Sequence, residues 1–279
     1  MTSTYENILG SYTDVVLLKE GGQKAAYRAN DPIHGRVVVK IGRYPSASAL
    51  ERIRREVEVL RCLKSSYYPK NIDFRTEAPN LFVIVEEYVE SQPLSALLTS
   101  FSSPPAALRL LKQLVVALDI IWQKRVVHRD LKPDNILVLA DKSPKIIDLG
   151  IARLLDEDSV TKTVNVRGPC TPAYAAPEQL KNRKAQIDQR TDQFGLGIVF
   201  VQLLLNGRHP FDPNVVGSGD SIPTNILSGN WARATFKALK HAASVEVLIT
   251  KLLGPEPHNR YRNCDALIRA IETCEGDVS

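Results

Sequence analysis

The residue types best suited to chemistry are gathered in one short segment, His128-Arg129-Asp130-Leu131-Lys132-Pro133-Asp134-Asn135. Asp130 can accept a proton from a hydroxyl group, and Lys132 supplies a positive charge close to it. Asn135 adds a neutral oxygen of the kind that binds a hard metal ion such as Mg²⁺. A base, a cation and a metal ligand fit phosphoryl transfer, which depends on positioning and charge neutralisation.

Three further charged residues lie in patterns that suit the same chemistry. Asp148, in Ile146-Ile147-Asp148-Leu149-Gly150, offers a carboxylate for a metal ion, although an Asp-x-Gly triplet alone is more often only a turn. Lys40 ends an apolar run, and Glu56 falls on the inner side of an amphipathic helix, where a carboxylate needs a partner. We expect Lys40 to be that partner; the alternative is a solvated glutamate on a helix edge.

The elements that position these residues change in kind along the chain. Apolar runs at 15–18, 36–41 and 81–85 predict buried strands. Between the last two, apolar residues at helical spacing predict an amphipathic helix, with Ser48 and Glu51 as its capping box. After Pro93 the pattern predicts mainly helices, including one that starts at Ser103, a buried one at 194–205 and a last one near 245–253.

The segment at 128–137 resembles the catalytic loop of Hanks-type protein serine/threonine kinases, including bacterial ones. Asp148 matches the metal-binding motif of that family, and Thr171-Pro172-Ala173-Tyr174-Ala175-Ala176-Pro177-Glu178 matches the end of its activation segment. The matches run from about residue 15 to residue 262. The resemblance implies an α+β, two-lobed kinase fold over 1–279, with a small sheet-rich N-lobe at about 1–85, a hinge at 86–90 and a larger, mainly helical C-lobe at 91–279.

The resemblance also implies a role for each matched residue, with ATP and Mg²⁺ (or Mn²⁺) as cofactors. Asp130, Lys132 and Asn135 would be catalytic, and Asn135 and Asp148 would hold the metal. The nucleotide would be bound by Lys40 with Glu56, by the phosphate-covering loop at Gly21 and Gly22, by Ala26, and by the hinge at Glu87 and Val89. Glu178, Asp192 and Arg260 would be structural supports. Lys132 indicates transfer to serine or threonine of protein substrates, which the sequence does not specify.

Two positions depart from the family pattern. The phosphate-covering loop keeps only Gly21 and Gly22 of three expected glycines, and Ala26 replaces a valine. Glu86 stands where a bulky apolar gatekeeper is usual, so its carboxylate must find a partner or reach water.

Regulation is expected at the activation segment. The family often uses an arginine beside the catalytic aspartate, here Arg129, to bind a phosphate on that segment. Ser159, Thr161 and Thr163 are the candidates for autophosphorylation, and Thr171 fits the residue that contacts Asp130 and Lys132. The alternative is a solvated polar loop.

Other classes of protein remain as alternatives. The depleted glycine loop is compatible with a pseudokinase scaffold, and a small-molecule kinase of the aminoglycoside or choline type would share part of the catalytic set. Nucleic-acid binding is poorly supported, because the net charge of +5 comes from 36 basic and 31 acidic residues that are scattered along the chain.

The sequence also predicts where the protein resides. Residues 1–10 lack the features of a signal peptide, and the apolar run at 194–205 is too short to cross a bilayer. The four cysteines, at 62, 170, 264 and 274, form no metal-binding or redox pair, so we expect reduced thiols in a cytoplasm. The oligomeric state stays open.

Overall fold

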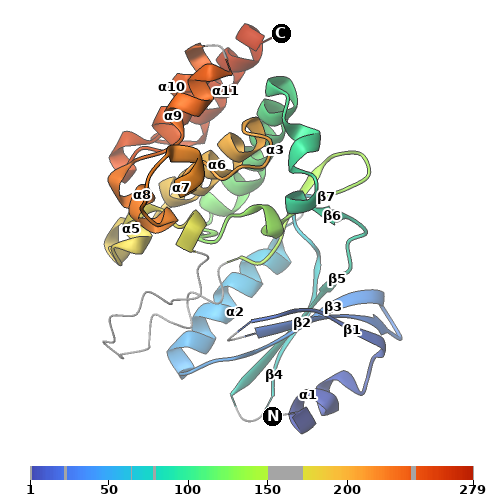
Figure 1. The fold of residues 1–279 in the computed structure, drawn as a ribbon. Coiled ribbons are helices and arrows are strands. Elements are labelled where there is room, and N and C mark those ends of the chain that lie inside the picture. The colour runs from blue at the N-terminus through green and yellow to red at the C-terminus, as the bar shows by residue number, and fades with distance from the viewer. Residues whose placement is uncertain are drawn as a thin grey trace. The chain divides into compact units, whose positions relative to one another are not determined.

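The computed structural model describes residues 2–21, 24–63, 65–77, 80–149, 172–239 and 243–278. These residues form two compact units, one through Glu90 and the other from Ser91 onward. The first unit is built on a five-stranded antiparallel sheet and the second is mainly helical (Figure 1). The predicted α+β fold class is therefore confirmed.

The first unit has its sheet strands in the order β1-β2-β3-β5-β4. Ile8 covers one face of the sheet from the N-terminal helix, and Ile53 and Val57 cover the other face from the second helix. The elements are α1 (Thr2–Leu9), β1 (Thr13–Glu20), β2 (Lys24–Asp31), β3 (Gly35–Arg43), α2 (Ala47–Cys62), β4 (Asn71–Glu77) and β5 (Leu81–Glu87).

The first strand was predicted to be buried, and this is wrong. β1 is exposed along its whole length, with Val15 at 37% and Leu18 at 51% of full exposure. The physical reason is its place at the edge of the sheet, where only β2 pairs with it. The strands expected at 36–41 and 81–85 are central and buried, as predicted.

The start of α2 also differs from the prediction. The N-cap is Ser46, whose hydroxyl accepts a hydrogen bond from the Ala49 amide at 3.1 Å. Ser46 has the extended backbone of a helix cap, so the helix begins at Ala47. Ser48 instead lies within the first turn, where its hydroxyl accepts from the Arg52 guanidinium at 3.3 Å.

The second unit surrounds a central buried helix, α6, as the apolar run at 194–205 predicted. The predicted helix after Ser103 is also present. The elements are β6 (Gln92–Pro93), α3 (Pro104–Trp122), β7 (Ile136–Val138), β8 (Pro144–Ile146), α5 (Pro177–Leu180), α6 (Gln189–Leu204), α7 (Pro213–Val216), α8 (Ile222–Ser228), α9 (Arg233–Ala238), α10 (Ala243–Leu252) and α11 (Cys264–Val278), with β6, β7 and β8 forming a small sheet.

Two glycines let the chain approach α6 closely. A Cβ atom on Gly197 would lie 2.9 Å from Leu252 Cβ, so a side chain there would push α10 away. A Cβ atom on Gly195 would lie 3.1 Å from Cβ of Leu131, which belongs to the segment that carries Asp130. The packing of α6 thus sets the position of that segment.

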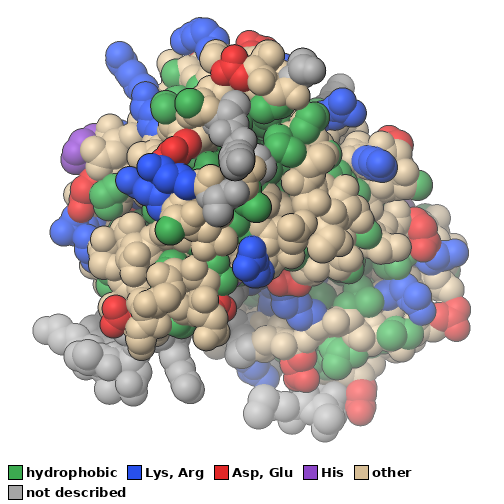
Figure 2. Space-filling model, turned by 45° about the horizontal axis from the view of Figure 1, so that its top comes forward, with side chains coloured by type: hydrophobic (Ala, Val, Ile, Leu, Met, Phe, Trp, Pro, Cys, Tyr) green, Lys and Arg blue, Asp and Glu red, His purple; other side chains and the backbone are tan. Residues whose placement is uncertain are grey.

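The surface charge is mixed. On the face in Figure 2, Lys and Arg side chains are scattered among acidic and apolar ones rather than collected in a stripe. Among the described residues, no helix is both long enough and apolar enough to span a membrane.

Candidate active site

The segment between α3 and β7 brings the predicted catalytic side chains together. Lys132 Nζ lies 2.9 Å from Asp130 Oδ2. Asn135 Nδ2 donates to the Asp130 carbonyl at 2.8 Å and to Asp130 Oδ2 at 3.1 Å. One carboxylate oxygen of Asp130 is therefore held by a cation and an amide, which fixes the direction of the side chain.

Two other side-chain oxygens of this cluster are left without a hydrogen-bond partner among the described residues. Asp130 Oδ1 and Asn135 Oδ1 are both buried, and neither has a hydrogen-bond partner within the part of the chain that the structure describes. A buried polar atom without a partner costs about 1–3 kcal/mol, and such atoms are typical of sites that bind something. The carboxylate oxygen can accept a hydroxyl proton, and the amide oxygen can bind a hard cation.

Asp192, in the first turn of α6, is hydrogen-bonded to the loop that carries Asp130. Its carboxylate accepts hydrogen bonds from the backbone amides of His128 at 2.9 Å and Arg129 at 2.8 Å, and from Trp122 Nε1 at 2.8 Å. Burial raises the pKa of Asp192, while these donors act in the opposite direction. The sequence indicated Asp192 but not Trp122. Because Trp122 lies at the end of an amphipathic helix, its position predicts only a side chain packed in the core.

His128 links the loop to the residue that precedes Asp148. The imidazole is fully buried, and this burial lowers its pKa, so the ring is neutral at pH 7. Its Nε2 lies 3.0 Å from the Ile147 carbonyl, and its Nδ1 lies 3.3 Å from the Asp130 amide. A neutral ring with the proton on Nε2 satisfies both contacts, because Nε2 then donates and Nδ1 accepts.

Two residues of this site have a strained backbone. Arg129 and Asp148 have φ angles of 66° and 60°, in the left-handed region that residues other than glycine rarely adopt. Gln179 Nε2 donates to the Arg129 carbonyl at 3.0 Å and so supports the strained loop from α5. Gln179 was not predicted, and the only signal for it was its place directly after Glu178.

Glu178 and Arg260 form a fully buried pair. Their side chains are 0% exposed, and two parallel contacts of 2.7 and 2.9 Å join them. Thr191 Oγ1 also donates to Glu178, and Arg260 Nε donates to the Gly254 carbonyl. Each charge is therefore compensated, which a pair at this depth requires.

In the first unit, Lys40, a predicted nucleotide-binding residue, forms an ion pair with Glu86, the residue at the expected gatekeeper position. Lys40 Nζ lies 2.6 Å from Glu86 Oε2, and the two side chains are only 7% and 11% exposed. Lys40 faces Ile84 across the β3–β5 ladder, so Glu86, two residues further along β5, lies on the same side of the sheet. The partner that the sequence required for Glu86 is thus Lys40.

Two other residues share this side of the sheet. Ala26 is directly opposite Lys40 in the β2–β3 ladder, and Asn71 is directly opposite Glu86 in the β4–β5 ladder. The Asn71 amide is buried, and neither its nitrogen nor its oxygen has a hydrogen-bond partner among the described residues. A polar patch therefore interrupts the apolar packing of the sheet against α2.

The remaining predicted residues are placed in part. Gly21 directly follows β1, and its amide donates to the Lys24 carbonyl at 2.9 Å. The Glu87 amide, at the end of β5, donates to the Lys70 carbonyl at 2.9 Å. Val89 follows β5, and residue 56 lies in α2. The Glu56 side chain and several predicted residues lie outside the described part of the chain; the latter are Gly22, Ser159, Thr161, Thr163 and Thr171.

Comparisons with known proteins agree with this arrangement. A family model described as "Protein kinase domain" matches residues 12–269. Serine/threonine-protein kinase PrkC of Bacillus subtilis (strain 168) is 32% identical over 273 residues, which cover 96% of this chain and 41% of that protein.

Two further relatives show the same pattern. Serine/threonine-protein kinase A of Synechocystis sp. (strain ATCC 27184 / PCC 6803 / Kazusa) is 29% identical over 295 residues, covering 96% of this chain and 54% of that protein. Serine/threonine-protein kinase PknB of Mycobacterium leprae (strain TN) is 32% identical over 260 residues, covering 88% of this chain and 40% of that protein. The chain thus spans about half or less of the length of these relatives. It belongs to the protein kinase family, as a domain similar to bacterial serine/threonine-protein kinases.

Proposed function

We propose that this chain transfers the γ-phosphate of ATP to a serine or threonine hydroxyl of a protein. The observation that carries the proposal is the buried Asp130 Oδ1, which has no hydrogen-bond partner among the described residues and lies beside Lys132 and Asn135. Use of ATP and a divalent metal ion is general in the protein kinase family. The names of the relatives support the serine/threonine class.

Asp130 is the proposed base. Its open oxygen accepts the proton of the substrate hydroxyl while the hydroxyl oxygen forms a bond to the γ-phosphorus and the bond to the β-phosphate oxygen breaks. Lys132, held at 2.9 Å from the other carboxylate oxygen, neutralises charge on the transferred group. The proton therefore ends on Asp130 and the phosphoryl group on the substrate.

Asn135 and Asp148 are the proposed ligands of Mg²⁺, or of Mn²⁺ as an alternative. The open Asn135 oxygen fits a hard cation, and the bound ion would neutralise phosphate charge. Within the described residues, no three His, Cys, Asp or Glu side chains gather into a metal cluster. Two protein oxygens completed by phosphate and water suit Mg²⁺, which keeps several waters.

The proposed nucleotide contacts come mainly from the first unit. Lys40 binds the α- and β-phosphates, with Glu56 and Glu86 as its carboxylate partners. Gly21 and Gly22 cover the phosphates, and Ala26 lies against the adenine. The backbone at Glu87 and Val89 binds the adenine edge. The register that places Ala26 opposite Lys40 supports this grouping.

One pair of variants tests the catalytic assignment. The purified protein is incubated with γ-labelled ATP, Mg²⁺ and a mixture of protein substrates, and labelled serine and threonine are measured. Asp130→Asn should abolish transfer, whereas Asp134→Asn, an identical change at an exposed position of the same loop, should retain it. Transfer by Asp130→Asn at the wild-type rate would refute the proposal.

A nucleotide-binding scaffold without catalysis is the second candidate. The observation that favours it is the short Lys40–Glu86 pair, because the carboxylate competes with phosphate for the same ammonium group. In that case the wild type and Asp130→Asn would bind ATP equally and neither would transfer phosphate.

A further inference from the structure

Asn71, the first residue of β4, has a buried amide group without a partner. The residue is 8% exposed, and neither its amide nitrogen nor its amide oxygen makes a hydrogen bond with any residue that the structure describes. Such an arrangement is costly, and a leucine of similar volume would fill the position without that cost. The amide therefore indicates a partner that comes within reach only when a neighbouring group moves.

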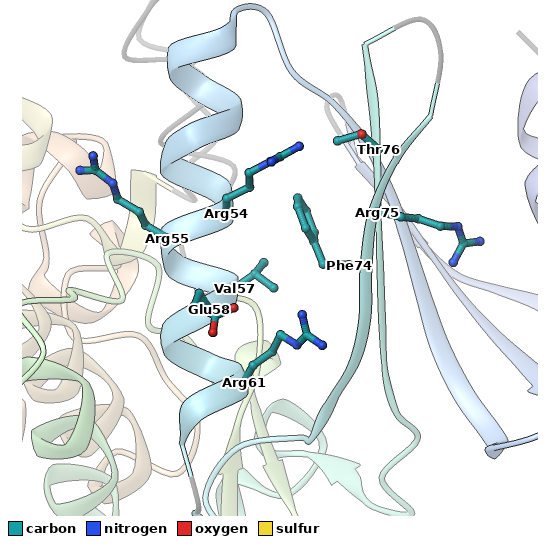
Figure 3. A pocket seen from close by; sticks show the side chains of 8 residues that line it. All are labelled: Arg54, Arg55, Val57, Glu58, Arg61, Phe74, Arg75 and Thr76. Carbon is teal, nitrogen blue, oxygen red and sulfur yellow. The ribbon is translucent and has the colours of Figure 1, made fainter.

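Asn71 and Glu86 are neighbours on the α2 side of the sheet. They are directly opposite in the β4–β5 ladder, which places their Cβ atoms about 4.5–5.5 Å apart with both side chains on one side. An irregularity between Asn71 and Asp73 adds one residue to β4, so Phe74 lies on this side as well. Figure 3 shows Phe74 pointing from β4 toward α2, which identifies the side.

Glu86 thus lies between two possible partners. Its strand, β5, is between β3 and β4 in the sheet, with Lys40 on the β3 side and Asn71 on the β4 side. In the structure the Glu86 carboxylate is bound to Lys40 Nζ at 2.6 Å. A glutamate side chain has three rotatable bonds, so its carboxylate can turn from one neighbouring strand to the other while the backbone stays in place.

The two partners differ in charge and in what else they bind. In the proposed nucleotide site Lys40 contacts phosphate, and a phosphate oxygen competes with Glu86 for the ammonium group. A buried carboxylate that loses its cation is strongly disfavoured, and it also repels the phosphate. The Asn71 amide offers neutral N–H donors on the far side of β5 from Lys40. Turning toward it gives Glu86 a hydrogen bond and takes its negative charge away from the phosphate.

We propose that Asn71 is a positioning residue of the nucleotide site, which receives the Glu86 carboxylate when a nucleotide phosphate binds Lys40. The inference rests on the proposed function, because it requires phosphate at Lys40, and it adds a second state of Glu86. The carboxylate is paired with Lys40 in the nucleotide-free protein and accepts a hydrogen bond from Asn71 Nδ2 in the nucleotide-bound protein. The unpaired amide of Asn71 is thus the receiver for the second state.

The first test compares a nucleotide with a ligand that lacks phosphate. Binding of the β,γ-imido analogue of ATP with Mg²⁺, and of adenosine, is measured by isothermal titration calorimetry. Asn71→Leu should weaken binding of the ATP analogue by about ten-fold or more, because the displaced carboxylate loses its hydrogen bond. Adenosine has no phosphate to displace Glu86, so its affinity should stay within about two-fold of wild type.

The matched control is Asn30→Leu, the same change in β2 of the same sheet. Asn30 is bound to Asp14 at 2.6 Å and does not belong to the proposed nucleotide-binding set. Both affinities of this variant should stay within about two-fold of wild type. A loss in Asn71→Leu that is equal for the ATP analogue and adenosine would mean that Asn71 only supports the packing of the sheet, which would overturn the proposal.

A double variant separates the receiving role from a structural one. Glu86→Met removes the carboxylate and keeps a long side chain, so Asn71 has nothing to receive. In that background Asn71→Leu should change the affinity for the ATP analogue by less than about two-fold. The thermal unfolding midpoint of Asn71→Leu without nucleotide should be no lower than that of wild type, because the change removes an unpaired buried amide. Equal losses of affinity in the two backgrounds would overturn the proposal.

Nuclear magnetic resonance of the protein with isotope-labelled asparagine observes the amide itself, whose signal is identified by its loss in Asn71→Leu. The ATP analogue should move an amide proton of Asn71 downfield in wild type but not in Glu86→Met, and adenosine should not move it. If the wild type binds the ATP analogue and this signal stays in place, the role of Asn71 is refuted while the nucleotide site stands. If the wild type does not bind the ATP analogue, the proposed function is refuted together with this inference.

Discussion

Lys40 Nζ lies 2.6 Å from Glu86 Oε2, and both side chains are nearly excluded from solvent. The pair places a carboxylate where the sheet would otherwise present an apolar side chain beside the lysine. In the proposed nucleotide site, a phosphate would share or exchange this ammonium group with Glu86. The proposal therefore couples the stability of the unit to nucleotide binding.

We expect Glu86→Gln to lower the free energy of unfolding without nucleotide by about 1–3 kcal/mol, because Lys40 loses a buried charged partner. The same change should strengthen ATP binding, since phosphate no longer competes with the carboxylate. Thermal unfolding with and without ATP and Mg²⁺ measures both effects. Glu90→Gln, in the exposed pair with Arg36, is the control and should change neither. A weaker response to ATP in Glu86→Gln would show that Glu86 assists the phosphate contact instead.

Asp192→Asn should impair catalysis more than nucleotide binding. An amide supplies one acceptor where the carboxylate serves three donors, so the amides of His128 and Arg129 lose part of their support. We expect kcat to fall roughly 10- to 100-fold, as small displacements of catalytic groups cause, with KM for ATP nearly unchanged. Asp188→Asn, at the N-cap of the same helix, should leave kcat intact, because asparagine also caps well. An unchanged kcat in Asp192→Asn would contradict the positioning role.

Arg260→Lys should destabilise the second unit by about 2–3 kcal/mol. Lysine keeps the charge but loses the paired contacts to Glu178 and the bond to the Gly254 carbonyl, which leaves buried acceptors unsatisfied. The free energy of unfolding in urea measures the change. Arg183→Lys, in a partly exposed pair with Glu256, should cost less than ~1 kcal/mol. Equal costs at the two sites would mean that the depth of the pair is unimportant.

Stability should fall as the pH is lowered from 6.5 toward 4. Burial lowers the pKa of His209 to about 4 and also lowers the pKa of His128 from the ordinary value of 6.5. At a pH below 6.5 the unfolded chain therefore binds protons more readily than the folded chain does. The contribution of these neutral histidines to the free energy of unfolding is complete above pH 6.5 and is lost as the pH falls. For His209 alone it amounts to roughly 3–4 kcal/mol, because the pKa falls from 6.5 to about 4 and one pKa unit corresponds to about 1.4 kcal/mol.

His209→Asn should flatten this part of the pH profile. Asparagine can still accept from the Phe211 amide, which donates to His209 Nδ1 at 3.2 Å, so the fold is retained while the titration is removed. His258→Asn, at an exposed position, should leave the profile unchanged. Unfolding in urea at pH 7.5 and pH 5 compares the three proteins; identical profiles for wild type and His209→Asn would exclude His209 as the source.

Autophosphorylation is expected at Ser159, Thr161 or Thr163, which lie outside the described residues. Arg129, beside the proposed base, is the cation expected to bind the new phosphate. Mass spectrometry after incubation with ATP and Mg²⁺ should locate phosphate between residues 149 and 171, and Asp130→Asn should carry none. Finding no phosphate in that interval of the wild type would refute the prediction.

The sequence predicts contacts best where they are local. Asp130, Lys132 and Asn135 lie within one turn-rich loop, so their types and spacing already indicated a cluster. Trp122 and Asp192 are 70 residues apart, and Gln179 and Arg129 are 50 apart, and such pairs form only once helices pack. The Lys40–Glu86 pair likewise depends on the register between β3 and β5, which composition does not determine.

Burial was harder to predict than the presence of elements. The apolar run at 15–18 correctly indicated a strand, but its exposure follows from its edge position, which is a property of the whole sheet. β2 and β4 were not predicted, because their polar and alanine-rich sequences show little of the apolar pattern of the central strands. The sequence pattern thus identified the apolar strands β1, β3 and β5 and missed β2 and β4.

The hydrogen bonds that Asp192 accepts from the loop affect how fast the loop amides exchange hydrogen with solvent. The amides of His128 and Arg129 belong to no helix or strand, yet both donate to a carboxylate that is itself 2% exposed. In deuterated water these amides should therefore exchange as slowly as those of the surrounding helices, since releasing them requires α6 to separate from the loop. The catalytic segment is irregular in conformation but should open only together with the core of its unit.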